Sequence, residues 1–92
     1  MRPDRYRFEV VARFIAERFP LPDTQTVLDV GGSTGVLAYH LARLGYDATV
    51  IDPRRPAVRR RFRKAAQKAG FISRLHYERR LLCATDTADL LV

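Results

Sequence analysis

Residues 26–53 read TVLDVGGSTGVLAYHLARLGYDATVIDP, and this stretch decides the fold. Residues 26–30 form a short apolar, β-branched run, which is typical of a buried parallel strand. A glycine-rich turn at 31–35 follows, and apolar residues then recur at helical spacing over 35–44. Residues 47–52 form a second strand-like run. This order of strand, turn, helix and strand predicts a right-handed βαβ unit.

The glycine turn and the end of the second strand predict a binding site. A helix N-terminus presents unpaired N–H groups and a partial positive charge, and glycines let a ligand approach bare backbone. A phosphate or carboxylate is therefore favoured at 31–35. Asp52 ends the second strand beside this turn, where a carboxylate can accept two hydrogen bonds from a ribose diol. A buried acid needs a partner to remain charged, and the sequence shows no obvious base next to Asp52.

The spacing of the glycines distinguishes two kinds of nucleotide-binding unit. A dinucleotide fingerprint needs G-x-G-x-x-G, and no register through the turn gives it. The observed D-x-G-x-x-x-G, which begins at Asp29, resembles motif I of the class I S-adenosylmethionine-dependent methyltransferases, D/E-x-G-x-G-x-G. The VID at 50–52 resembles the acidic second motif of that family. The resemblance departs from the family pattern at Ser33, where the middle glycine usually stands.

The resemblance implies a site for S-adenosylmethionine. Asp29 would organise the glycine loop or meet the methionine amino group, Asp52 would hold the ribose hydroxyls, and Pro53 would lie against the adenine. The methionine part would be lined by Gly31, Gly32, Ser33 and Gly35. No catalytic base or nucleophile is implied, because methyl transfer depends mainly on in-line positioning. The alternative is a βαβ unit whose glycine turn serves only to pack the helix on the strand.

The flanking sequence extends this unit at both ends. Further helices are predicted at 5–19 and 56–69, and further strands at 73–82 and 89–92. In the first helix, Val11, Phe14 and Ile15 follow helical spacing and are expected to form its apolar face. The 92 residues therefore predict one α/β domain, a three-layer α/β/α Rossmann-like parallel sheet with strand order 3-2-1-4.

The C-terminal part of this pattern departs from the family in two ways. The family commonly has an acid after the third strand near the adenine, whereas Arg79 and Arg80 stand here and Asp86 is the nearest alternative. The family sheet also continues beyond the fourth strand, so we expect a truncated sheet that holds only the cofactor half. The strand at 89–92 would then leave an open apolar edge, which predicts self-association or a partner chain.

Basic residues dominate the third predicted helix. The formal net charge of the chain is +7, and no acid occurs between Pro53 and Gly70. Contact with RNA or another acidic partner is one interpretation, and a solvated face of an arginine-rich protein is the other. The candidate contact residues are Arg54, Arg55, Arg59, Arg60, Arg63 and Lys64.

The rest of the composition limits the classes of protein. Cys83 is the one cysteine, so no intramolecular disulfide is expected, in keeping with a cytoplasmic location. With two histidines, His40 and His76, no metal site is expected. No apolar run approaches the ~20 residues of a membrane span.

These observations predict the S-adenosylmethionine-binding part of a methyltransferase, with RNA as one candidate acceptor. Two alternatives stay open. One is a noncatalytic nucleic-acid-binding or assembly module that keeps a vestigial methyltransferase fold. The other is a nucleotide-binding unit of dehydrogenase type, which the glycine spacing disfavours.

Overall fold

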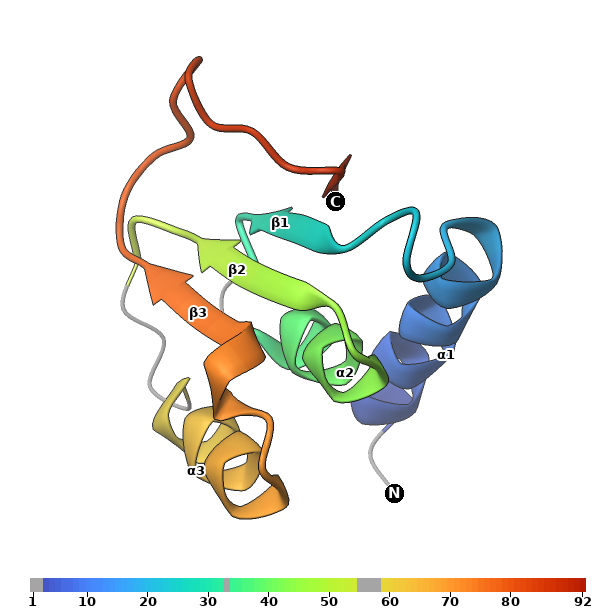
Figure 1. The fold of residues 1–92 in the computed structure, drawn as a ribbon. Coiled ribbons are helices and arrows are strands. Elements are labelled where there is room, and N and C mark those ends of the chain that lie inside the picture. The colour runs from blue at the N-terminus through green and yellow to red at the C-terminus, as the bar shows by residue number, and fades with distance from the viewer. Residues whose placement is uncertain (1–2, 33, 55–58) are drawn as a thin grey trace.

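The computed structural model describes residues 3–32, 34–54 and 59–92, which form an α/β structure on one sheet (Figure 1). The helices are α1 (Pro3–Arg18), α2 (Val36–Leu44) and α3 (Arg59–Ala69), with a 3-10 turn at Ile72–Arg74. The strands are β1 (Thr26–Val30), β2 (Asp47–Ile51), β3 (Leu75–Glu78) and β4 (Leu90–Leu91).

The sheet is parallel throughout, with the strand order β3-β2-β1-β4. This confirms the predicted Rossmann-like sheet and its 3-2-1-4 order. The central strand β1 pairs with β2 in a register that runs from Thr26↔Asp47 to Val30↔Ile51. The two strands therefore end level with each other, and the segments that follow them meet at the carboxyl end of the sheet.

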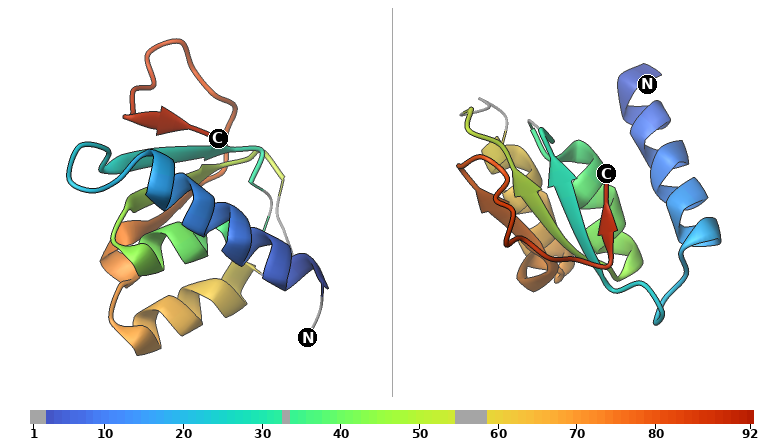
Figure 2. Two further views of the ribbon diagram at one scale, coloured as in Figure 1. Left: turned by 90° about the vertical axis from the view of Figure 1, so that its right-hand side faces the viewer. Right: turned by 90° about the horizontal axis from the view of Figure 1, so that it is seen from above.

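All three described helices cover the same face of the sheet, as the views in Figure 2 show. The described residues thus supply the sheet and one of the two helical layers of the predicted α/β/α arrangement. The connection 79–89 between β3 and β4 crosses the opposite face without forming a helix (Figures 1 and 2). Apolar side chains remain exposed near this face, including Val30 and Leu91.

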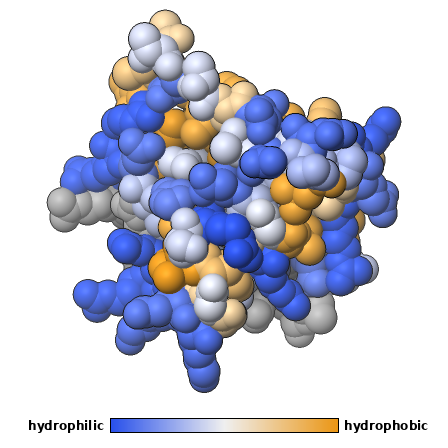
Figure 3. Space-filling view, in the orientation of Figure 1, coloured by the Kyte–Doolittle hydropathy of each residue, from blue (hydrophilic) through white to orange (hydrophobic). Residues whose placement is uncertain are grey.

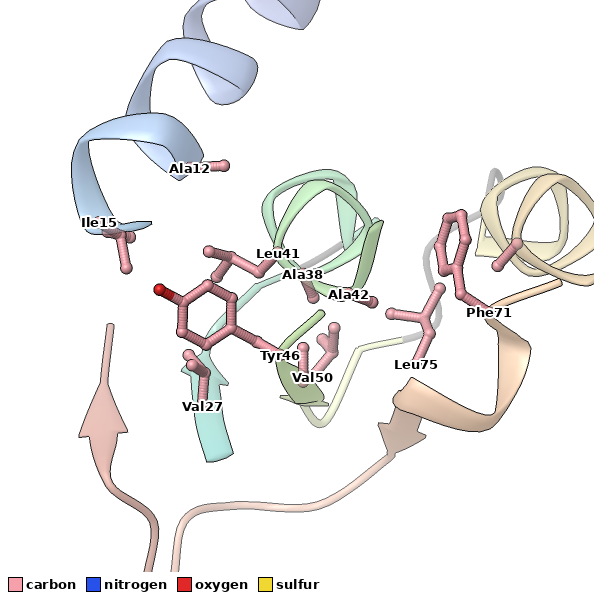
Figure 4. Packing of buried hydrophobic residues seen from close by; sticks show 12 residues of the cluster. Ala12, Ile15, Val27, Ala38, Leu41, Ala42, Tyr46, Val50, Phe71 and Leu75 are labelled. Carbon is pink, nitrogen blue, oxygen red and sulfur yellow. The ribbon is translucent and has the colours of Figure 1, made fainter. Parts of the chain in front are cut away.

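The core lies between the helices and the face of the sheet that they cover (Figure 4). Successive side chains of a strand point to opposite faces, so Val27 and Val50 join the cluster on the helix side, while Leu28 and Ile51 are buried outside that cluster. Ala38 and Ala42 are fully buried, and their small size lets α2 lie close to the strands. Burial of a side chain such as Leu41 stabilises the fold by roughly 1.5–3 kcal/mol.

Helix α1 is buried along a narrower stripe than the spacing of its apolar residues predicts. Ala12 and Ile15 are buried, whereas Val11 and Phe14 are 37% and 54% exposed. The expectation that Val11 and Phe14 line the buried face is therefore wrong. Helix α1 packs mainly against α2 at the side of the layer, so only one edge of its apolar surface is covered (Figure 2).

The third strand is shorter than the predicted range 73–82. Residues 72–74 form the 3-10 turn, and β3 ends at Glu78, opposite Ile51, the last residue of its partner β2. Beyond this point Arg80 binds Asp86 and Glu78. The predicted start of the third helix at 56 lies outside the described residues. No helix in the described part of the chain is long and apolar enough to cross a membrane.

Candidate cofactor site

Two buried carboxylates lie where β1 and β2 end. The side chains belong to Asp29 and Asp52, which are 6% and 4% exposed. Burial, and then the negative charge of Asp52, raise the pKa of Asp29 to about 6. The Oδ2 atom of Asp29 has no hydrogen-bond partner among the described residues. A buried polar atom in this state costs free energy, so the oxygen marks a place for a donor that the described residues do not supply.

The first part of the glycine turn brings bare backbone against this carboxylate. Gly31, with a φ of 71°, donates its N–H to the carbonyl of Ile51 at 2.8 Å and so fixes the turn to the end of β2. A Cβ atom on Gly32 would lie 2.5 Å from Oδ2 of Asp29. A larger residue at 32 would therefore have to displace the carboxylate of Asp29.

The second part of the turn opens helix α2. Gly35 is its N-cap, with a φ of 83°, and no side chain caps the helix at this position. The first N–H groups of α2 thus have no side-chain acceptor at the cap, which favours an anionic group there. A Cβ atom on Gly35 would collide with the hydroxyl of Tyr77, which donates to the carbonyl of Thr34 at 3.1 Å.

Tyr77 is a supporting residue that the sequence analysis missed. It belongs to β3, is half-buried against the core, and reaches the backbone of Thr34 with its hydroxyl. The alternation of residues in β3 was the available signal, because it places Tyr77 on the same face as Leu75. Nothing in the local sequence, however, indicates that this face reaches Thr34.

Asp52 is paired, and the expectation that it lacks a neighbouring base is wrong. Its Oδ1 accepts the backbone N–H of Arg54 at 2.9 Å and Nε of Arg54 at 3.0 Å, while its Oδ2 accepts Nη2 at 2.9 Å. The chain turns immediately after β2, and this turn brings Arg54 back over the carboxylate of Asp52. These hydrogen bonds, and then the charge of Asp52, raise the pKa of Arg54.

The predicted adenine side carries arginines. Pro53 is exposed, and its carbonyl accepts Nε of Arg79 at 3.2 Å. Arg80 is turned away and holds Asp86 with two hydrogen bonds, of 2.7 and 2.8 Å. This contact, followed by the N–H of Cys83, lowers the pKa of Asp86 to about 2. Asp86 is therefore bound by Arg80 and Cys83 within the connection 79–89.

The described site residues thus divide into those at the site and those away from it. The residues gathered at the ends of β1 and β2 are Asp29, Gly31, Gly32, Gly35, Asp52, Pro53 and Arg54. Exposed positions on α3 hold Arg60, Arg63 and Lys64. Ser33 and Arg55 lie outside the described residues, and the side chain of Arg59 is not described. No group of three metal-ligating side chains occurs in the described ranges.

Comparison with known proteins agrees with this geometry. Residues 4–90 match the family model of a methyltransferase domain. The chain belongs to the methyltransferase domain family, which confirms the resemblance to class I S-adenosylmethionine-dependent methyltransferases. Among curated proteins, no sequence matches the chain.

Several solved structures share the fold. Coclaurine N-methyltransferase bound to N-methylheliamine and SAH has a TM-score of 0.67 at 17% identity, covering 91% of this chain and 26% of that one. The glycopeptide N-methyltransferase MtfA has a TM-score of 0.67 at 20% identity, covering 88% and 39%. YjhP from E. coli has a TM-score of 0.67 at 19% identity, covering 99% and 36%. The chain thus spans between 26% and 39% of the length of these structures.

Proposed function

We propose that this chain binds S-adenosylmethionine and is the cofactor-binding part of a methyltransferase. The observation that carries the proposal is Oδ2 of Asp29, a buried oxygen without a partner among the described residues, beneath the bare backbone of Gly32. The family to which the chain belongs supports the same ligand. When bound, S-adenosylmethionine supplies the methyl group for transfer.

Each polar part of such a ligand has a complementary group on the chain. The ammonium of the methionine part suits Asp29, because a donated hydrogen bond and a positive charge both stabilise its buried carboxylate. The ligand carboxylate suits the N–H groups that open α2 after Gly35. The ribose diol suits Asp52, whose two oxygens lie at the end of β2.

Calorimetric titration with S-adenosylhomocysteine tests this proposal. We expect the wild type to bind and Asp52→Ala to lose at least about tenfold in affinity, since it removes a buried acceptor of the diol. Asp23→Asn, which removes a charge from an exposed acid, is the matched control and should bind like the wild type. Binding of NAD without binding of S-adenosylhomocysteine would instead favour a dehydrogenase-type unit, and no binding of either would refute the proposal.

A second candidate function is contact with RNA through the basic face of α3. This face is formed by the exposed residues Arg60, Arg61, Arg63, Lys64 and Lys68, which make no ion pair with other described residues. Figure 3 shows hydrophilic side chains standing out from this part of the surface, at the lower left. An uncompensated row of cations attracts phosphates without regard to sequence.

Fluorescence anisotropy with a single-stranded RNA across salt concentration tests the second candidate. Replacing Arg60, Arg63 and Lys64 together by Gln should reduce the slope of log affinity against log salt by about 2. The same replacement of Arg7, Arg13 and Arg18 on α1 removes equal charge elsewhere and should leave the slope unchanged. Affinity that does not fall as salt rises would reject RNA contact.

Strand β4 forms the edge of the sheet through which the sequence predicted self-association of the chain. Within the described residues, β4 pairs with β1 alone, and Leu91 and Val92 are 51% and 37% exposed. We propose a second copy of the chain as the partner, joined by strand pairing along this edge. Light scattering at micromolar concentration should give a dimer mass, and a monomer mass would refute it.

A further inference from the structure

An ion pair at the end of β2 engages both carboxylate oxygens of Asp52. Arg54 gives Asp52 three hydrogen bonds, one from its backbone N–H and two from its side chain. The side-chain bonds are divided between the two oxygens, with Nε on Oδ1 and Nη2 on Oδ2. The guanidinium therefore uses both oxygens of the carboxylate, and a diol would need the same two.

The two side-chain hydrogen bonds that Arg54 gives Asp52 can be replaced by the two that a ribose diol donates. A carboxylate has room for about four hydrogen bonds, and a ribose diol donates two. The bond from the backbone N–H of Arg54 to Oδ1 belongs to the turn after β2, so it can stay when the side chain leaves. Departure of the guanidinium then leaves one vacated position on each oxygen, which matches the two hydroxyl groups.

Solvent exposure decides which partner of the pair moves. The side chain of Asp52, directly after β2, is 3% exposed, whereas that of Arg54 is 69% exposed. The buried carboxylate cannot be left without donors, because an unpaired buried charge is strongly destabilising. The guanidinium, by contrast, can return to water at little cost.

We propose that Arg54 occupies the diol-binding oxygens of Asp52 in the free chain, and that the cofactor binds by displacing its guanidinium. The proposal rests on the proposed function, because it concerns the same site. It makes Arg54 a competitor of the ribose, and the measured affinity for the cofactor then includes the free energy of opening this pair.

Calorimetric titration of S-adenosylhomocysteine into Arg54→Ala tests the proposal. We expect roughly two- to fivefold tighter binding than in the wild type, as an exposed charge pair predicts. Arg54→Lys keeps the charge but not the two-pronged contact, and it should fall between the two. Arg43→Ala, which removes an equal charge from an exposed position on α2, should bind like the wild type.

An NMR measurement follows the displacement in the wild type itself. The Nε–H signal of Arg54 should be protected from exchange in the free chain and should lose that protection at saturation with S-adenosylhomocysteine. A thermal melt of each variant establishes that it is folded before affinities are compared.

The outcomes separate the two proposals. If the wild type binds but Arg54→Ala binds no more tightly, or the Nε–H signal stays protected at saturation, the competition is refuted and the cofactor site stands. If neither binds, the proposed function fails and the competition fails with it.

Discussion

An aspartate side chain lies at each end of β1, and the two carboxylates differ in how fully they are hydrogen-bonded. At the start of the strand, Oδ2 of Asp89 accepts the N–H groups of Gln25 and Thr26 at 2.8 and 3.1 Å. The N–H of Asp89 in turn donates to Oγ1 of Thr26 at 2.9 Å. At the far end of the strand, Asp29 is buried with one oxygen, Oδ2, that has no hydrogen-bond partner among the described residues.

The protonation of the two acids reflects this difference. Backbone hydrogen bonds from Gln25 and Thr26 lower the pKa of Asp89, whereas burial and the charge of Asp52 raise that of Asp29 to about 6. Asp89 therefore stabilises the fold by joining β4 to β1, while Asp29 as an anion destabilises it. A buried acid that opposes folding is expected where a ligand supplies the missing contact.

The largest expected effect concerns the turn that covers Asp29. Gly35 and Gly31 both have positive φ, but only Gly35 has a neighbour, Tyr77, in the path of a Cβ atom. Gly35→Ala should therefore lower the free energy of unfolding by about 2–5 kcal/mol, and Gly31→Ala by about 1–2 kcal/mol. Urea denaturation measures both, and equal losses would show that Tyr77 does not constrain the turn.

The next effect is the pH dependence that Asp29 brings to stability. Its folded pKa of about 6 lies above the ordinary value of 3.8, so the folded state holds the proton more tightly. The contribution of Asp29 is therefore fully present below pH 4 and is lost as pH rises through 6, by at most about 3 kcal/mol. Asp29→Asn should be more stable than the wild type at pH 8, and the difference should vanish near pH 4 in urea titrations. A variant less stable at pH 8 would contradict the assignment of Oδ2 of Asp29 as an oxygen without a partner among the described residues.

The smallest effect is expected at the other acid. Asp89→Ala removes the acceptor of two N–H groups on the surface, so its midpoint of urea denaturation at pH 7 should fall. Asp23→Ala, at an exposed acid, is the control and should leave the midpoint unchanged. Opposite signs for Asp89→Ala and Asp29→Asn would establish the contrast between the two ends of β1, and a shared sign would remove it.

The sequence predicted the centre of the fold well because its signals there are local. Residues 26–52 contain a strand, a glycine turn, a helix and a second strand whose spacing and turn residues are all close in sequence. Burial on α1 could not be predicted in the same way. Ala12 is buried while Phe14 is exposed because of where α2 lies, and periodicity carries no information about a packing partner.

The pair of Asp52 and Arg54 was missed although its signal is also local. An acid at the end of a strand, followed two residues later by an arginine, fits a turn in which the longer side chain folds back. The end of β3 was missed for a different reason. No local signal marks Glu78 as the last residue, because β3 ends where its partner β2 ends, at the pair Ile51↔Glu78.

The pairing of the first strand with the last has a consequence for synthesis on the ribosome. Val27 lies opposite Leu90, and Thr26 meets Asp89 across 63 positions of sequence. At roughly 5–20 residues per second, β1 waits about 3–13 seconds after its own synthesis before β4 emerges. During that interval the nascent chain exposes one long side of β1 to any extended segment nearby. This topology therefore exposes the edge of β1 to pairing with a wrong strand during co-translational folding.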